Sequence, residues 1–157
     1  MRITFAFCCL AILAIPGQVS AQNVEQGRAI LEGKGACLTC HRIRESGSRA
    51  GPDLSAIGAA LSAEAVTKVL VDPNAALRPA VRSVRVVTQD GKEIVGRRLN
   101  EDMYSVQFID ETGELRSMDK SRLRAFSILT AARMPSYKDK LTESELADLV
   151  AYLRSLK

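Results

Sequence analysis

Two cysteines and a histidine form the stretch of this sequence with the clearest chemistry, Cys37-Leu38-Thr39-Cys40-His41. Two thiols separated by two residues on the first turn of a helix, with an imidazole directly after the second, is the spacing of a c-type haem attachment site. Each cysteine sulfur can add to one haem vinyl group, and His41 can then bind the iron as its proximal axial ligand. The motif predicts one covalently attached haem c, held by Cys37 and Cys40.

Three other uses of the motif fit less well. A structural zinc site needs about four nitrogen or sulfur ligands, so a carboxylate would have to join Cys37, Cys40 and the single histidine of the chain. A thioredoxin-like redox pair follows a strand, whereas the residues before Cys37 have a helical pattern and a Gly-rich turn. A disulfide between the two cysteines would close a small, strained loop that adds little stability.

The first 21 residues are typical of a secretory signal peptide. Arg2 gives a positively charged start, residues 3–15 are an almost unbroken apolar run, and small residues ending at Ala21 form a cleavage site. The run of about 13 residues is too short to span a bilayer. We therefore expect export to the periplasm as a secreted protein, cleavage after Ala21 and no membrane span afterwards. Cys8 and Cys9 would be removed. Retention of the segment as an uncleaved anchor is the alternative.

The charge balance argues against a nucleic-acid partner. The chain has 157 residues, with 22 basic and 18 acidic side chains and a net charge of +4. Loss of Arg2 with the signal peptide lowers this charge to about +3, which two haem propionates would nearly cancel. The basic residues are interleaved with acidic ones, and an exported protein rarely meets DNA. We therefore expect a solvated surface with, at most, a local docking patch.

Helical periodicity occurs at both ends of the remaining chain. Asn23 is a capping signal for a first helix, in which Gly27 is costly unless another element crosses closely at that point. Thr142 begins a capping box for a C-terminal helix that carries Tyr152 beside a leucine-rich stripe. We expect these two helices to cross at short range. Residues 62–71 are predicted to form a third, short amphipathic helix.

The apolar period changes from helical to alternating between residue 80 and about residue 130. The strand candidates are residues 82–88, 93–99, 103–109, 114–118 and 123–128. Asp90-Gly91 is a strong hairpin-turn signal between the first two candidates, and Gly96 predicts a bend or bulge. This pattern predicts an inserted antiparallel module, similar to a small barrel.

Together these features resemble the class I c-type cytochromes, and more narrowly the haem-binding domain family first catalogued in planctomycetes and Verrucomicrobia. The matching pieces are the first helix with Gly27, the CLTCH motif, Gly51-Pro52-Asp53-Leu54, Val71-Asp72-Pro73, Asp90-Gly91-Lys92, Met134-Pro135 and residues 141–156. The resemblance implies a mainly α cytochrome c fold formed by residues 22–79 and 131–157. The β module of residues 80–130 would interrupt this fold, which makes the chain α+β overall.

The resemblance also suggests how the iron is held. In related cytochromes the carbonyl of the proline after the motif orients the proximal histidine, and Pro52 matches that position. His41 is the only histidine, so the sixth ligand must be methionine, lysine, water or nothing. Met134 is followed by a stiffening proline and lies where the family places its distal ligand. Met103 and Met118 lie in predicted strands. We therefore expect His41 and Met134 as the axial ligands.

A His/Met pair fills both axial positions and raises the reduction potential of the iron. We therefore expect a periplasmic electron carrier and not an enzyme. A separate redox donor and acceptor would serve it, such as a periplasmic dehydrogenase and a terminal oxidase or reductase. One alternative is a haem enzyme or a peroxide-binding or gas-binding protein with a displaceable methionine. Another alternative is a subunit that docks to a dehydrogenase through the β module. Charge reversal of Arg97 and Arg98 would test this docking role.

Overall fold

The computed structural model describes residues 22–157, and the predicted signal peptide at residues 1–21 lies outside the described residues. The helices are α1 (Val24–Glu32), α2 (Ile57–Ala60), α3 (Ala63–Val71) and α4 (Glu143–Ser155). Two short strands, β1 (Arg42–Ile43) and β2 (Ser46–Gly47), pair with each other. A larger sheet contains β3 (Ser83–Thr88), β4 (Glu93–Glu101), β5 (Ser105–Asp110), β6 (Leu115–Asp119) and β7 (Leu123–Ile128). Single 3₁₀ turns occur at Cys37–Thr39, Pro79–Val81 and Lys120–Arg122.

The predicted mainly α cytochrome c fold is wrong. Only 32% of the structure is helical, and its largest regular feature is the five-stranded antiparallel sheet. The helices are short because strong stop signals follow them: Gly33 ends α1, and Asp72 with its following proline ends α3. The motif itself forms one 3₁₀ turn at Cys37–Thr39 and not the first turn of an α-helix. Most of the chain between α1 and α3 is therefore turn and loop.

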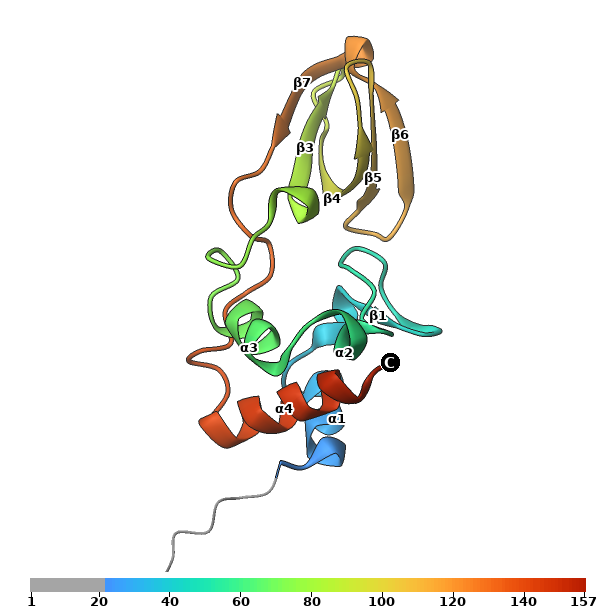
Figure 1. Cartoon of the computed structure of the whole chain (residues 1–157). Coiled ribbons are helices and arrows are strands. Elements are labelled where there is room, and N and C mark those ends of the chain that lie inside the picture. Colours follow the sequence, from blue (N-terminus) through green and yellow to red (C-terminus); the bar gives the residue numbers. More distant parts are fainter. Residues whose placement is uncertain (1–21) are drawn as a thin grey trace, which may run out of the picture.

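The helices and the large sheet have separate hydrophobic cores. The helical core includes Leu31, Leu70 and Leu149, and Cys37 lies within it. Figure 1 shows α1 and α4 crossing below the loop that carries β1, with the large sheet above that loop. The loop is therefore the part of the helical region that faces the sheet.

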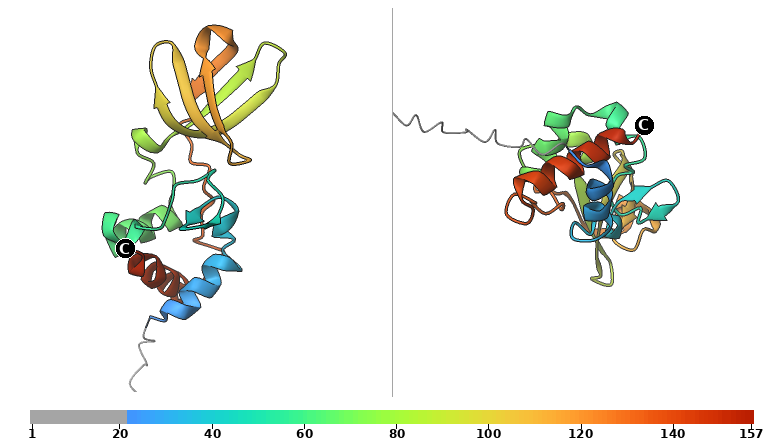
Figure 2. Two further views of the ribbon diagram at one scale, coloured as in Figure 1. Left: turned by 90° about the vertical axis from the view of Figure 1, so that its right-hand side faces the viewer. Right: turned by 90° about the horizontal axis from the view of Figure 1, so that it is seen from below.

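Helices α1 and α4 cross at Gly27, as the sequence predicts. A Cβ atom on Gly27 would lie 2.0 Å from the backbone oxygen of Asp148 and 2.8 Å from the Cβ of Tyr152. The backbone N–H of Asn23 donates to the Asp148 carboxylate at 2.7 Å, which fixes the start of α1 against α4. Thr142 and Glu145 form the predicted capping box at the start of α4. The crossing is visible from below in Figure 2.

We expect the Gly27→Ala variant to be less stable, although alanine is the better helix former by about 1 kcal/mol. The added methyl group overlaps backbone atoms that cannot rotate away, and overpacking of this kind lowers the free energy of unfolding by about 3 kcal/mol. Urea unfolding monitored by circular dichroism measures the change. Ala29→Gly, at an exposed position of α1, is the control. It should lower the free energy of unfolding only by the difference in helix propensity between alanine and glycine. A Gly27→Ala variant more stable than the parent would show that the helices do not cross closely.

The large sheet has the strand order β6-β5-β4-β3-β7, with all neighbours antiparallel. The predicted hairpin turn at Asp90-Gly91 joins β3 to β4, and Gly91 has the positive φ of 86° that such turns require. The sheet core consists of Val84, Val86, Val106 and Phe108, which are fully buried. All five predicted strands are present, with ends that differ by up to two residues.

The glycine in β4 has a different role from the one predicted. The register shift in this strand lies between Arg98 and Asn100, not at Gly96. A Cβ atom on Gly96 would lie 2.4 Å from the backbone oxygen of Ile109 and 2.5 Å from a ring carbon of Phe108. Gly96 therefore makes room for the packed aromatic ring in the core of the sheet.

Candidate functional site

The CLTCH motif lies on a tight turn that follows α1. Gly35 donates its N–H to Ile30 O at 2.7 Å, and Ala36 has a left-handed backbone with φ of 47°. The N–H of His41 donates to Cys37 O at 2.8 Å, which closes the turn. Cys37 is buried, Cys40 is exposed, and both are free thiols. The turn therefore holds two unpaired thiols and one imidazole together.

His41 is held by the loop that follows it. Its Nδ1 atom lies 2.7 Å from the carbonyl oxygen of Pro52. Because a carbonyl oxygen can only accept, Nδ1 carries the proton in this contact, and Nε2 of the neutral ring keeps its lone pair. Burial lowers the pKa of His41, the contact with Pro52 opposes this, and the positive charge of Arg97 lowers the pKa further. The net effect favours the neutral ring, which is the form that binds a metal.

Two glycines allow the loop backbone to pass close to the histidine. A Cβ atom on Gly47 would lie 2.2 Å from His41 O, and one on Gly51 would lie 2.9 Å from both His41 Nδ1 and Cys40 O. Gly47 also has a positive φ of 98°. The sequence pattern predicted a loop at Gly51 but did not show that its backbone packs against the imidazole.

Met134 lies in the loop between β7 and α4. Its side chain is half-buried and packs against the helical core, the same core that contains Cys37. Met103 is 79% exposed at the end of the sheet, and Met118 packs against the sheet core. The structure therefore places Met134 in the same core as the motif, and it places Met103 and Met118 with the sheet.

The loop that carries Met134 is tied to its surroundings on both sides. Ala132 donates its N–H to the side-chain oxygen of Asn74 at 2.8 Å. After Met134, the Ser136 hydroxyl donates to the backbone oxygen of Val71 at 2.6 Å. Both acceptors lie at or just after the end of α3. The position of Met134 is therefore fixed by contacts that local sequence patterns do not show.

Tyr137 joins the Met134 loop to the motif turn. Its buried hydroxyl donates to Gly35 O at 2.6 Å, two residues before Cys37. Its backbone N–H donates to Leu70 O at 2.9 Å. Burial raises the pKa of Tyr137 to about 12, with a further contribution from the adjacent Cys37. Burial likewise raises the pKa of the Cys37 thiol. Tyr137 was not predicted from the sequence, in which its only signal is its place as an aromatic residue three positions after Met134.

The raised pKa of Tyr137 predicts a stability loss in strong alkali. The unfolded chain ionises this hydroxyl near pH 10, whereas the folded chain keeps it neutral to about pH 12. The stability that the neutral hydroxyl contributes to the folded chain is complete below pH 10 and is lost as the pH rises through 12. We expect Tyr137→Phe to lower the free energy of unfolding by about 1 kcal/mol at pH 8, because it removes a buried hydrogen bond, and to lose part of the alkaline dependence.

Urea unfolding at pH 8 and at several values above pH 10 measures this effect. Tyr104→Phe is the matched control, because Tyr104 is 75% exposed. Equal unfolding curves for the Tyr137 and Tyr104 variants would contradict the role given to the buried hydroxyl.

The side chains around the motif are of the chemical kinds that a covalently attached haem would require. Two free thiols, an imidazole with an available Nε2 and a half-buried thioether form a suitable set of attachment and axial groups. Several partly buried apolar side chains also pack against the core that contains Cys37, and these can cover a flat apolar cofactor: Leu38, Ile43, Leu54, Ile57 and Leu61. Across residues 22–157, no group of three or more His, Cys, Asp or Glu side chains is placed to hold a bare metal ion.

Most charged side chains of the sheet face partners of opposite charge. Arg85 pairs with Glu93 on the neighbouring strand, and Arg98 and Lys120 both pair with Glu101. Such pairs at a protein surface contribute little to stability. They give the sheet a mixed-charge surface. Arg98 also donates to Pro79 O at 2.8 Å. Arg97, the other position named for docking, is directed instead to the motif loop and donates to Arg49 O at 3.2 Å. The two arginines therefore have different partners.

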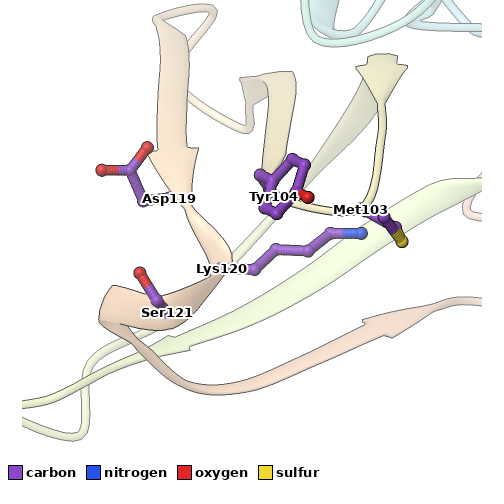
Figure 3. A pocket seen from close by; sticks show the side chains of 5 residues that line it. All are labelled: Met103, Tyr104, Asp119, Lys120 and Ser121. Carbon is purple, nitrogen blue, oxygen red and sulfur yellow. The ribbon is translucent and has the colours of Figure 1, made fainter.

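A shallow pocket of about 190 Å³ lies at the end of the sheet remote from the helices. Figure 3 shows the side chains that line it, Met103, Tyr104, Asp119, Lys120 and Ser121. The Lys120 ammonium lies 4.4 Å from the ring centre of Phe126 and pairs with Glu101, so its charge is already compensated. The prediction that Met103 lies in a strand is wrong, since it lies exposed between β4 (Glu93–Glu101) and β5 (Ser105–Asp110).

No protein-family model matches this chain, and no curated protein matches it. None of the helices in the described part of the chain is both long and apolar enough to cross a bilayer.

Proposed function

We propose that this protein is an exported monohaem c-type cytochrome that carries single electrons between redox partners. The main support is the contact between His41 Nδ1 and Pro52 O, which leaves the lone pair of Nε2 free on the residue that directly follows the two free thiols in the chain. The spacing of the motif and the placement of all three groups on one turn agree with covalent haem attachment. The resemblance to haem-binding cytochrome domains points to the same chemistry.

In this proposal each group of the turn has one task. Cys37 and Cys40 would hold the haem through thioether bonds, and His41 Nε2 would bind its iron. Pro52 holds the imidazole in the required orientation and tautomer, because its carbonyl accepts the Nδ1 proton. When bound, the haem supplies an iron that alternates between the ferric and ferrous states by one electron.

Met134 would supply the second protein ligand of the iron. Contacts at Ser136 and Tyr137 fix its loop against α3 and the motif turn, which would hold the thioether in a defined position. A filled sixth position leaves no site where a substrate can bind the iron. For this reason we propose an electron carrier and not a peroxide-processing or gas-binding enzyme.

The apolar side chains around the motif have a second task. Leu38, Ile43 and Leu54 pack against the helical core and lower the polarity around the proposed haem. A less polar environment disfavours the more highly charged ferric state and raises the reduction potential. Together with thioether ligation, this suits exchange with a separate donor and acceptor, for which we propose redox proteins of the periplasm. Complexes of this type are small and transient.

A potentiometric titration of the purified protein tests this function. We expect a single transition with the slope of a one-electron couple. We also expect a ferrous spectrum that carbon monoxide does not change, because Met134 occupies the sixth position. Rapid carbon monoxide binding, together with peroxide turnover, would instead identify a haem enzyme with an open or displaceable axial position.

A further inference from the structure

A second pocket, of about 290 Å³, lies where the large sheet meets the motif loop. Arg42 follows His41 directly, Arg49 and Asp53 belong to the same loop, and Arg97 comes from β4. Figure 1 shows this loop below the sheet, and the backbone nitrogen of Arg49 would lie 3.8 Å from a Cβ atom on Gly113 in the β5–β6 turn. The pocket therefore joins residues from the two halves of the molecule.

Positive charge exceeds negative charge in this pocket. Three guanidinium groups line it, against the single carboxylate of Asp53, which already accepts a hydrogen bond from Ser55 N at 2.7 Å. Arg42 Nη2 lies 3.5 Å from both carboxylate oxygens of Glu45, and its Nε donates to Arg44 O. Within the part of the chain that the structure describes, neither Arg49 nor Arg97 makes a salt bridge.

The Arg97 side chain has hydrogen-bonding capacity that the protein does not use. Its Nη2 donates to Arg49 O at 3.2 Å, but its Nε is buried and has no hydrogen-bond partner among the described residues. Burial and the nearby charge of Arg49 lower the pKa of Arg97, and Asp53 opposes this only partly. An unpaired buried donor on a charged group is costly. An anion in the pocket would compensate the charge of Arg97, whose guanidinium makes no salt bridge among the described residues.

We propose that this pocket binds an oxyanion, either a carboxylate or a phosphate, between Arg42, Arg49 and Arg97. The planar guanidinium group presents paired donors that match the two oxygens of such an anion. Two sources can supply this chemistry. One is a propionate of the haem attached at the neighbouring motif, in which case the inference rests on the proposed function. The other is a small anion taken up from solution.

Either source gives the sheet a specific role. Arg97 would connect β4 to an anion held against the loop of His41, so the sheet would help to fix that loop. This role differs from partner docking, which would use exposed charges. It also explains why Arg97 is directed inward while its neighbour Arg98 bonds to Pro79 and Glu101.

Inorganic phosphate is the probe for the free anion, added to the purified full-length protein and followed by calorimetry and phosphorus NMR. If the anion comes from solution, phosphate binds with one-to-one stoichiometry, and Arg97→Gln weakens binding at least tenfold. Arg85→Gln is the matched control, because the Arg85 side chain on β3 is 41% exposed and pairs with Glu93 away from the pocket residues. It should bind phosphate as the parent does.

If the anion is a haem propionate, phosphate does not bind the haem-loaded protein. Arg97→Gln then shifts the propionate carboxylate bands in infrared difference spectra between the ferric and ferrous states, and Arg85→Gln leaves them in place. Arg49→Gln, an exposed loop position, provides a second variant with the same expected effects if Arg97→Gln does not fold.

The proposal is overturned if phosphate does not bind and the carboxylate bands do not move, or if the Arg97 and Arg85 variants behave alike. A colourless protein that binds phosphate through Arg97 would refute the haem proposal and still support the anion pocket. The failures of the two proposals are therefore distinguishable.

Discussion

Replacing Cys37 and Cys40 together with alanine is expected to give a protein without covalently bound haem. Both thiols lie on one turn beside His41, and the thioether bonds cannot form without them. Mass spectrometry of the purified chain should show the polypeptide mass alone, whereas the parent should carry the added mass of one haem. Each single variant should retain only one attachment point and accumulate less coloured protein.

The full-length sequence offers a matched control for this experiment. Cys8 and Cys9 lie in the predicted signal peptide, so a double alanine variant at these positions should keep the parent's haem content. Equal haem content in the Cys37/Cys40 variant and in the parent would contradict covalent attachment at the motif. A mature chain that begins after Ala21 would support export.

Met134→Ala is expected to lower the reduction potential by on the order of 100 mV, because thioether ligation favours ferrous iron and the axial ligands set haem potentials over a range of about 0.8 V. The smaller side chain leaves the sixth position open to water. The ferrous variant should then bind carbon monoxide, which the parent should resist. A potentiometric titration and the visible spectrum under carbon monoxide measure both effects.

Met103→Ala is the control for this variant, since Met103 is 79% exposed at the far end of the sheet. It should leave the potential and the carbon monoxide response unchanged. If Met134→Ala behaves like Met103→Ala, Met134 is not a ligand and only packs against the helical core. The buried contact of Tyr137 with Gly35 would then serve loop stability alone.

The parts of the fold that short patterns specify were predicted well. Side-chain caps at Asn23, Ser62 and Thr142 begin the helices where the sequence indicates, because a cap is a contact across only three residues. The alternating pattern located all five strands of the large sheet, and Asp90-Gly91 located its first hairpin. Gly27 correctly indicated a close crossing with α4.

The fold class was predicted wrongly, because a few motifs that resemble those of cytochromes were taken to mean that the whole fold is mainly helical. The stretch between α1 and α3 matches those motifs yet contains mainly turns and loops, and its longest helical piece is the four-residue α2. Glycines such as Gly47 and Gly51 let this stretch wrap around His41, which a helix could not do. The five-stranded sheet is therefore the largest regular feature of the structure.

Contacts across long sequence separations account for most of what was missed at the candidate site. Tyr137 and Gly35 are 102 residues apart, and Arg97 and Arg49 are 48 residues apart. No periodicity or local motif encodes such pairs, because they form only when the helical region and the sheet are folded. The interpretation of Arg97 as a docking charge followed from composition alone, whereas its inward contact is a feature of the folded chain.

Extraction of the purified protein with acidified acetone, followed by a pyridine haemochrome spectrum of the protein pellet, tests the central claim most directly. Covalent attachment through Cys37 and Cys40 predicts that the pigment stays with the polypeptide and that the spectrum is that of haem c, at one haem per chain. A colourless protein, or a pigment that leaves entirely with the acetone, would contradict the claim.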